Sequence, residues 1–213
     1  SLLLLNVPAD TRGLIHEVDS LRLMELRCAM DEIFSRDLSA GGRVVADNVR
    51  GDSRRFKAQN ILDKDYDKYW STDDDVTNAS FIVNLPESRT FNRVQLQEYI
   101  PLGQRVAAFS IEALMEDGSW QAIAHETTIG YKRIVHVPTT TTNAVRVTIT
   151  DAEACPLING FSLYMDNIYT SHEMSNVPSG EVRPSSETLI ADLGSVTPIR
   201  GFVYAPKVAG EDG

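Results

Sequence analysis

Apolar residues alternate with polar ones through most of the middle of the chain. Val94 and Leu96 are flanked by polar residues, and Phe109 and Ile111 repeat this pattern further on. A period of two is typical of strands that turn one face toward a core. The alternating segments are 81–85, 93–100, 109–113, 120–124, 133–137, 145–149 and 161–165. Short strands at such intervals, one pair joined by the turn sequence Asp117-Gly118, predict an all-β sandwich over residues 47–166.

A strand and a helix are expected before the sandwich. The apolar run 2–7 is typical of a strand that is covered on both faces, and the helical period follows over 18–38. The helix carries two adjacent apolar stripes, so we expect it to lie between two bodies. The stripes are Val18, Leu21, Met24 and Cys28, and Leu23, Leu26, Met30 and Ile33. One strand cannot satisfy its own backbone groups, so residues 1–46 are expected to be the end of a larger domain, completed by a companion chain or by the same polypeptide.

The segment after the sandwich has a different composition. Residues 167–187 are rich in Ser and Glu, include Pro178-Ser179-Gly180, and are expected to form a linker. Two more apolar runs, 189–194 and 199–204, predict the first strands of a further domain over 188–213.

The net charge of the chain bears on the kinds of molecule that it can bind. A formal net charge of −10 argues against nucleic acid, because phosphate binding needs a basic face, and Arg54, Arg55 and Lys57 are the only tight basic group. No apolar run approaches the length of a membrane span. The two cysteines do not make a disulfide framework, so both are expected to be free, with Cys28 buried in the helix and Cys155 in a loop.

An acidic run suggests a metal site. Asp63 and Asp65 bring carboxylates close together, and carboxylate oxygens suit calcium. Lys68 follows them, and its ammonium group would repel the ion. The alternative is a solvated loop held by Asp63. We therefore expect no cofactor, with a structural calcium as the less favoured reading.

Several side chains are candidates for contacting a ligand. Glu98 and Arg105 belong to a dense polar cluster with Gln97 and Gln104. As a sugar site, Arg105 would donate to hydroxyl groups and Glu98 would accept from them; as structure, these groups would satisfy one another in a buried network that fixes a loop, and we favour the network. Tyr131, in a glycine-containing loop, would offer an aromatic face to a sugar. Trp70 is expected in the core.

Several motifs resemble a known family. Leu3-Leu4-Leu5-Asn6-Val7-Pro8 and Arg12-Gly13-Leu14-Ile15-His16-Glu17 resemble the last barrel strand and helix of the α-L-fucosidases of glycoside hydrolase family 29. Asn60-Ile61-Leu62-Asp63 and Tyr69-Trp70-Ser71-Thr72-Asp73 are similar to the entry of a discoidin-like domain, also called coagulation factor type C or family 32 carbohydrate-binding module. Three further motifs resemble the discoidin-like domain of such fucosidases: Leu96-Gln97-Glu98-Tyr99-Ile100, Gly103-Gln104-Arg105-Val106 and Thr127 to Ile134. Two later motifs, Asp192-Leu193-Gly194 and Ile199 to Tyr204, resemble the first strands of a further galactose-binding-like domain.

The resemblance implies a mainly β, discoidin-like sandwich behind the end of a (β/α) barrel, in a periplasmic or secreted, exo-acting α-L-fucosidase. A retaining glycosidase needs two carboxylates about 5 Å apart. In the family these lie in earlier barrel strands, so no catalytic residue is assigned here and the chain alone is expected to be inactive. The sandwich would brace the barrel or, as an alternative, dock the enzyme on galactose- or fucose-containing glycans. In discoidin-like domains the loop at Asp63 often holds calcium, but Lys68 replaces the usual Thr, and 159–161 offer no Glu.

Overall fold

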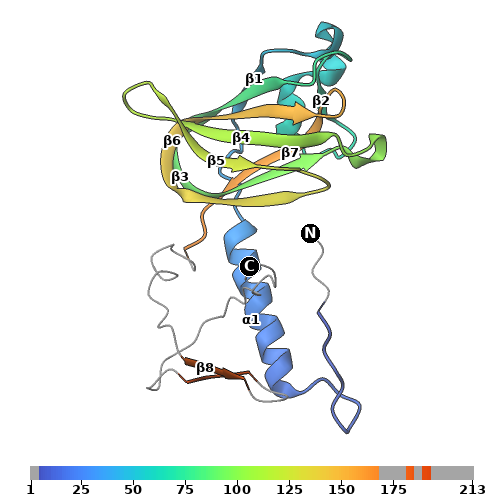
Figure 1. Ribbon diagram of the computed structural model, residues 1–213, viewed down its shortest axis with the longest axis vertical. Coiled ribbons are helices and arrows are strands. Elements are labelled where there is room, and N and C mark those ends of the chain that lie inside the picture. The colour runs from blue at the N-terminus through green and yellow to red at the C-terminus, as the bar shows by residue number, and fades with distance from the viewer. Residues whose placement is uncertain (1–4, 168–180, 185–188, 193–213) are drawn as a thin grey trace, which may run out of the picture. The chain divides into compact units, whose positions relative to one another are not determined.

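The computed structural model describes residues 5–167, 181–184 and 189–192. The chain divides into two units, residues 1–170 and 171–213. The described part of the first unit holds helix α1 (Glu17–Phe34), several short 3₁₀ turns and seven strands (Figure 1). The strands are β1 (Arg43–Ala46), β2 (Trp70–Ser71), β3 (Ala79–Glu98), β4 (Val106–Leu114), β5 (Trp120–Glu126), β6 (Arg133–Ala152) and β7 (Leu157–Tyr164).

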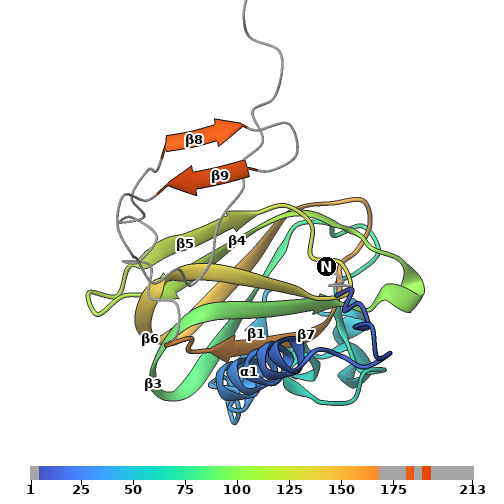
Figure 2. The ribbon, with the colours of Figure 1, turned by 90° about the horizontal axis from the view of Figure 1, so that it is seen from below.

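The second unit contains an antiparallel pair of strands. These are β8 (Glu181–Pro184) and β9 (Leu189–Asp192), whose arrows run in opposite directions in Figure 2. β9 lies where a strand was predicted from residue 189, whereas β8 lies inside the range 167–187 that was predicted to be a linker. The predicted strand 199–204 lies outside the described residues.

Two long bent strands build the sandwich. All pairings are antiparallel, in the order β2-β7-β3-β6-β4-β5, with β1 also on β3. One half of β3 (79–84) joins β1, β4, β5 and the second half of β6 in one layer, while its other half (89–98) joins β7, β2 and the first half of β6 in the opposite layer. The register of β3 against β6 shifts between Asn84 and Arg89 and again between Phe91 and Arg93. Bulges bend a strand without ending its pairing. The segments predicted as four strands, 81–85 with 93–100 and 133–137 with 145–149, are therefore two, and both curve between the layers (Figure 1).

The core lies between these layers. Trp70 is completely buried, as predicted, and its indole N–H donates to the carbonyl of Asn48 at 2.8 Å. The ring of Phe81 lies edge-on to Trp70 and to Phe161, with centroids 5.4 and 6.1 Å away. The other fully buried large aromatic side chains are Phe91 and Phe109. Aromatic pairs of this geometry stabilise a core beyond the area that they bury.

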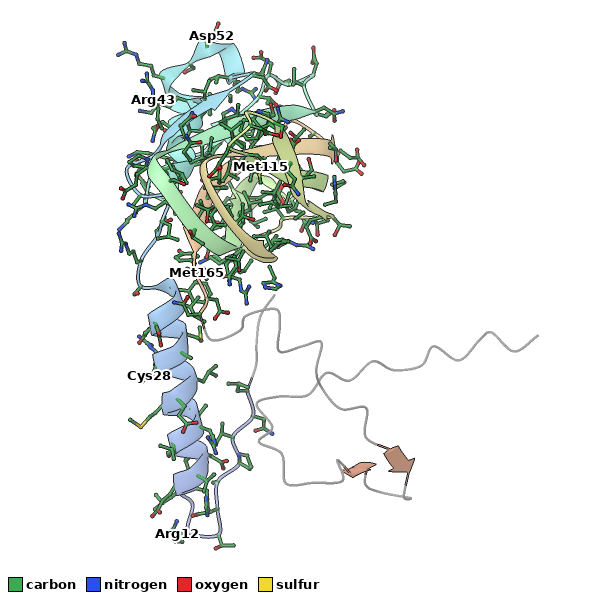
Figure 3. The ribbon with its side chains drawn as sticks, turned by 90° about the vertical axis from the view of Figure 1, so that its left-hand side faces the viewer. Arg12, Cys28, Arg43, Asp52, Met115 and Met165 are labelled. Atoms are coloured by element: carbon green, nitrogen blue, oxygen red, sulfur yellow. The ribbon has the colours of Figure 1, made fainter. Side chains whose placement is uncertain are left out.

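Helix α1 begins close to the predicted position but ends earlier. The His16 side chain accepts from the backbone N–H of Val18 at 3.2 Å and caps the first turn. The helix ends at Phe34 rather than at residue 38, because the following residues bind the sandwich: the backbone N–H of Leu38 donates to the carbonyl of Leu163 at 2.8 Å. No residue of α1 is buried. The prediction that Cys28 is buried is therefore wrong, and Figure 3 shows its thiol extending from the side of the helix.

The segment before α1 differs from the prediction as well. Of the expected strand 2–7, only residues 5–7 are described, and they form no strand. A strand needs a neighbour for its backbone groups, and the described residues supply none here. The boundary expected at residue 46 also moves: β1 pairs with β3, so the sandwich begins at Arg43. No described helix is long and apolar enough to cross a membrane.

Candidate functional site

Loops from distant parts of the sequence meet at one end of the sandwich. The loop that follows β3 is bound to the start of β7, since the N–H of Tyr99 donates to the carbonyl of Leu157 at 2.9 Å. The loop before β6 is bound to the end of β3, since the N–H of Glu98 donates to the carbonyl of Gly130 at 3.0 Å. The acidic loop after the 3₁₀ turn Ala58–Leu62 is held by the Asn159 side chain, whose amide donates to the carbonyl of Tyr66 at 3.0 Å. These hydrogen bonds fix the loops of this end relative to one another.

Glu98 lies beneath these loops. Its carboxylate is completely buried and accepts three backbone N–H groups, those of Arg105 (2.8 Å), Val106 (3.0 Å) and Gly130 (2.8 Å). Burial of a charge is tolerated when several donors satisfy it. Glu98 therefore joins two loops and has no surface for a ligand, which corrects the expectation that it contacts sugar. Its partners are main-chain groups, whereas the expected network consisted of side chains.

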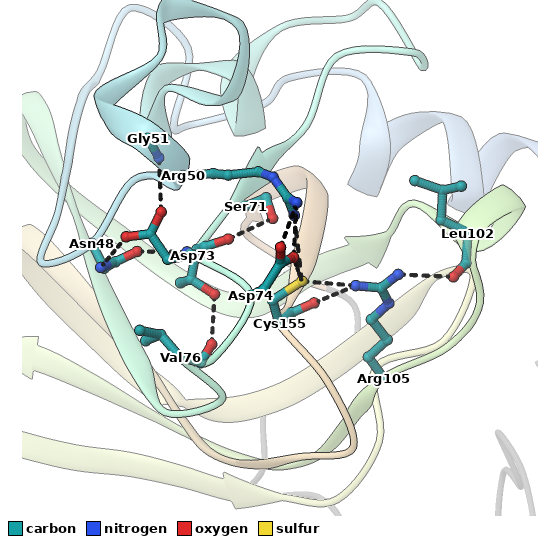
Figure 4. A network of polar contacts seen from close by, with 11 residues as sticks. Asn48, Arg50, Gly51, Ser71, Asp73, Asp74, Val76, Leu102, Arg105 and Cys155 are labelled. Carbon is teal, nitrogen blue, oxygen red and sulfur yellow. Dashed lines mark hydrogen bonds and ion pairs between the residues drawn. The ribbon is translucent and has the colours of Figure 1, made fainter.

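Arg105 belongs to a second group of contacts, drawn in Figure 4. Its Nη1 donates to the carbonyl oxygen of Cys155 at 2.8 Å and lies 2.9 Å from the thiol Sγ, and its Nη2 donates to the carbonyl of Leu102 at 3.3 Å. Arg50 approaches the same thiol from the other side and pairs with Asp74 at 2.8 Å. The guanidinium of Arg105 thus holds two loops together. A role for it in sugar binding stays a prediction.

Four tyrosine rings lie close to one another at this end of the sandwich. The rings of Tyr69 and Tyr99 are stacked, with centroids 4.6 Å apart and planes at 18°, and Tyr66 lies 5.6 Å from Tyr99. Tyr131 lies 6.3 Å from Tyr66. The exposed fractions are 40% for Tyr66 and 61% for Tyr131. We call these four side chains the tyrosine strip. A strip of ring faces with hydroxyl groups at their edges offers both apolar contact and hydrogen bonds.

Tyr131 was the only member of the strip that the sequence suggested. Tyr66 was hidden in the acidic run, and Tyr99 follows a buried strand residue, so neither had a local pattern that marked it. Tyr99 also donates from its hydroxyl to a carboxylate oxygen of Asp67 at 3.2 Å. Partial burial and this hydrogen bond raise the pKa of the Tyr99 hydroxyl. The Tyr99 hydroxyl is therefore neutral at physiological pH, and its ring is held in place by its neighbours.

The proposed metal ligands bind a side chain instead. The ammonium of Lys68 donates to Asp63 at 2.8 Å and lies 3.6 Å from a carboxylate oxygen of Asp65. This contact lowers the pKa of Asp63 and raises the pKa of Lys68. The ammonium occupies the space between the two carboxylates that a cation would need. The geometry supports the alternative reading, in which Asp63 holds a solvated loop.

The comparisons with known proteins agree with this architecture. The family model of the F5/8 type C domain matches residues 45–165. The chain belongs to this family. It is also homologous to α-L-fucosidases, which confirms the resemblance seen in the motifs. It is 35% identical over 191 residues to the putative alpha-L-fucosidase 1 of Oryza sativa subsp. japonica, a match that covers 89% of this chain and 37% of the rice protein.

Solved structures give the same result. A putative alpha-L-fucosidase from Bacteroides thetaiotaomicron is 36% identical, with a TM-score of 0.73, over 78% of this chain and 36% of that protein. The chitosan-binding module 1 of a chitosanase/glucanase from Paenibacillus sp. IK-5 is 21% identical, with a TM-score of 0.53, over 60% of this chain and 97% of the module, and this likeness shows the fold alone. The chain spans little more than a third of the length of the two fucosidases.

Proposed function

We propose that this chain is the non-catalytic region of an exo-acting α-L-fucosidase and that it braces the catalytic domain. The observation that carries the proposal is the row of exposed apolar side chains on α1, which includes Leu21 (55% exposed) and Met24 (65%). Val18 belongs to the same stripe, and Leu26 and Met30 of the second stripe are exposed as well. Rows of this kind on soluble proteins mark surfaces that another body covers. The homology to α-L-fucosidases supports a catalytic domain as that body.

The connection between α1 and the sandwich suits such a brace. Phe34 in the last turn of α1 lies edge-on to Tyr164 at the end of β7, with centroids 5.0 Å apart. Just beyond the helix, Asp37 accepts from the N–H groups of Ser39 and Leu163 at 2.9 and 3.2 Å. Contacts made on both sides of the helix end restrict its motion relative to β7. A body that packs on α1 is thereby held against the sandwich.

Catalysis itself is assigned to the rest of the barrel. Hydrolysis of a terminal α-L-fucose with retention needs a nucleophile and an acid/base carboxylate. The carboxylate of Glu98 binds main-chain groups, and Asp63 binds Lys68. We expect the 213-residue chain to release no nitrophenol from 4-nitrophenyl α-L-fucoside. Release of nitrophenol at a rate proportional to the concentration of the chain would contradict the assignment of catalysis to the rest of the barrel. The secreted or periplasmic location stays a prediction.

The brace is tested in the polypeptide that joins this chain to its catalytic domain. Leu21→Asn with Met24→Gln makes the row polar, and the exposed Arg22–Glu25 ion pair serves as control through Arg22→Gln with Glu25→Gln. Covering a half-exposed Leu or Met is worth about 1 kcal/mol each, so the first pair should lower the melting temperature by about 2–4 °C. The control pair should leave it within about 1 °C, since exposed ion pairs contribute little. Equal melting temperatures for both pairs would rule out a packed α1.

A second candidate function is carbohydrate binding by the tyrosine strip. The exposure of Tyr66 and Tyr131, beside the loops that Glu98 fixes, favours it. Exposed rings in a fixed arrangement match the apolar faces of pyranose rings. Titration of the chain with fucose- and galactose-containing oligosaccharides, followed by Tyr131→Ala, tests this candidate. Saturable binding that Tyr131→Ala removes would support it, and its absence for all these sugars would exclude it.

A further inference from the structure

The only tight basic group of the sequence lines a hollow next to the tyrosine strip. Arg54, Arg55 and Lys57 come from the short 3₁₀ turn Arg54–Phe56 and the residue after it, and Lys68 comes from the acidic loop. The hollow has a volume of about 270 Å³ and is completed by Asn60 and Asp63. Four cationic side chains and one carboxylate therefore surround it, in a chain whose formal net charge is −10. We call it the basic hollow.

Two of its cations make no ion pair or side-chain hydrogen bond within the described part of the chain. Lys68 is neutralised by Asp63 at 2.8 Å. Arg55 lies over the ring of Phe56, with its guanidinium carbon 5.4 Å from the centroid, so its N–H groups remain at the edge. Arg54 and Lys57 make no ion pair or side-chain hydrogen bond with any residue that the structure describes, and both are exposed, although the charge of Lys57 contributes to lowering the pKa of Asp63. The hollow thus keeps positive charge and hydrogen-bond donors that the fold itself does not use.

The basic hollow and the tyrosine strip are joined by aromatic rings. Phe56, beside the hollow, lies 5.4 Å from Tyr69, and Tyr69 is stacked on Tyr99 at 4.6 Å. From there the rings continue to Tyr66 and Tyr131. A short oligosaccharide with its pyranose rings on the strip would bring a substituent to the hollow. The volume of the hollow suits one sugar unit or its charged group, since pockets for larger ligands begin at about 300 Å³.

We propose that the basic hollow binds the anionic group of an acidic saccharide whose neighbouring rings lie on the tyrosine strip. The group is a carboxylate of a uronic acid or a sulfate ester, because both present planar or trigonal oxygen sets that a guanidinium fork and an ammonium recognise. This inference rests on the second candidate function, saccharide binding. It adds a class of ligand that neither the brace nor neutral sugar binding requires.

The test compares acidic and neutral saccharides that otherwise match. The 213-residue chain is titrated by calorimetry with trigalacturonic acid and its methyl ester, and with a sulfated fucose oligosaccharide and its desulfated form. Within at least one pair, the acidic member should bind about tenfold more tightly, and the difference should shrink as NaCl rises from about 50 to about 300 mM. The pair that shows the difference identifies the anionic group. Equal affinities within both pairs would overturn the inference.

Variants assign the effect to the basic hollow. Arg54→Gln with Lys57→Gln removes its two unpaired cations, and Arg36→Gln with Arg43→Gln removes two exposed cations that do not line it. The first pair should weaken binding of the acidic saccharide by about tenfold and leave the neutral one unchanged, while the second changes neither. The inference would be overturned if the Arg54→Gln, Lys57→Gln variant had an unchanged circular dichroism spectrum and still bound the acidic saccharide more tightly than its neutral counterpart.

Two further outcomes separate this inference from the proposed functions. If inorganic sulfate binds as tightly as the sulfated oligosaccharide, the basic hollow is a simple anion site, and the proposed contribution of the sugar rings to binding is refuted. Absence of binding by every saccharide, acidic or neutral, would exclude saccharide binding together with this inference, and leave the brace on α1 untouched. Neutral binding that Tyr131→Ala removes, without any preference for acidic members, would retain saccharide binding and exclude the acidic class.

Discussion

Replacement of Glu98 by glutamine measures how much one buried carboxylate contributes to the loop end. One carboxylate oxygen accepts from the N–H groups of Arg105 and Val106, and the other accepts from Gly130. Glutamine has the same shape but a single acceptor oxygen. If that oxygen keeps the first two bonds, the new NH₂ group faces the N–H of Gly130, and a buried donor loses its partner.

The expected cost follows from the bonds involved. A hydrogen bond to a charged group contributes about 1.5–3 kcal/mol, and an unsatisfied buried donor costs about 1–3 kcal/mol. The two remaining bonds weaken because their acceptor is no longer charged, while relief from burying the carboxylate offsets part of the loss. Glu98→Gln should therefore lower the free energy of unfolding by about 2–4 kcal/mol, a large share of the 5–15 kcal/mol that is typical of a domain.

Urea denaturation at neutral pH, followed by circular dichroism, provides the measurement. With a slope of about 1–3 kcal/mol per molar urea, the midpoint should fall by about 1–2 M. Glu116→Gln, in the exposed β4–β5 hairpin, is the control and should change the free energy by less than about 0.5 kcal/mol. The amide of Gly130 should also exchange faster with solvent. A loss below about 1 kcal/mol with an unchanged slope would refute the assignment of Glu98 as a charged triple acceptor.

Three other predictions concern the core and the acidic loop. Trp70→Phe loses the indole hydrogen bond to a backbone carbonyl and leaves a cavity, so urea denaturation should show a free energy of unfolding lower by about 2–4 kcal/mol. A decrease under about 1 kcal/mol would contradict the packing of Trp70. Gly160→Ala would place a Cβ 2.4 Å from Oε1 and 3.1 Å from Cβ of Gln97, so it should lower the free energy of unfolding by about 1–3 kcal/mol. Adding Gln97→Ala to this variant should restore at least half of that loss, and strictly additive effects of the two substitutions would contradict the clash. Because Lys68 lowers the pKa of Asp63, their contact stabilises the fold above about pH 4, and this stabilisation is lost as the pH falls further. In an NMR titration, Lys68→Gln should raise the pKa of Asp63 toward its ordinary value, and an unchanged pKa would contradict the contact.

The strand pattern was readable because alternation is a local property. Whether a residue such as Val94 faces the core depends on the pleat of its own strand, and the Asp117-Gly118 turn needs only the positive φ that glycine tolerates, here +83° for Gly118. The same locality explains the error in counting strands. A bulge interrupts the alternation, as it does between residues 85 and 92 of β3, so the pattern cannot distinguish two strands from one that bends between layers.

The candidate site depended on contacts between distant residues. Tyr66, Tyr99 and Tyr131 come from three different loops, and they meet because Asn159 and Glu98 hold those loops by hydrogen bonds to their main chains. No spacing along the sequence reports such contacts. For Glu98 the sequence left sugar binding open beside the favoured buried network, since its polarity was visible and its complete burial was not.

The sequence alone therefore sufficed for the β class, the core position of Trp70, the basic group at Arg54 to Lys57 and the resemblance to fucosidases, because each rests on composition, local periodicity or motif order. Only the tertiary structure revealed which polar groups are consumed by the fold and which remain free for a ligand. Lys68 and Arg105 carry the same charge as Arg54, yet the first two are bound by Asp63 and by main-chain oxygens, while Arg54 has no partner among the described residues. That difference arises from the positions of neighbouring loops, which are set by long-range packing and hydrogen bonding and not by the residue itself.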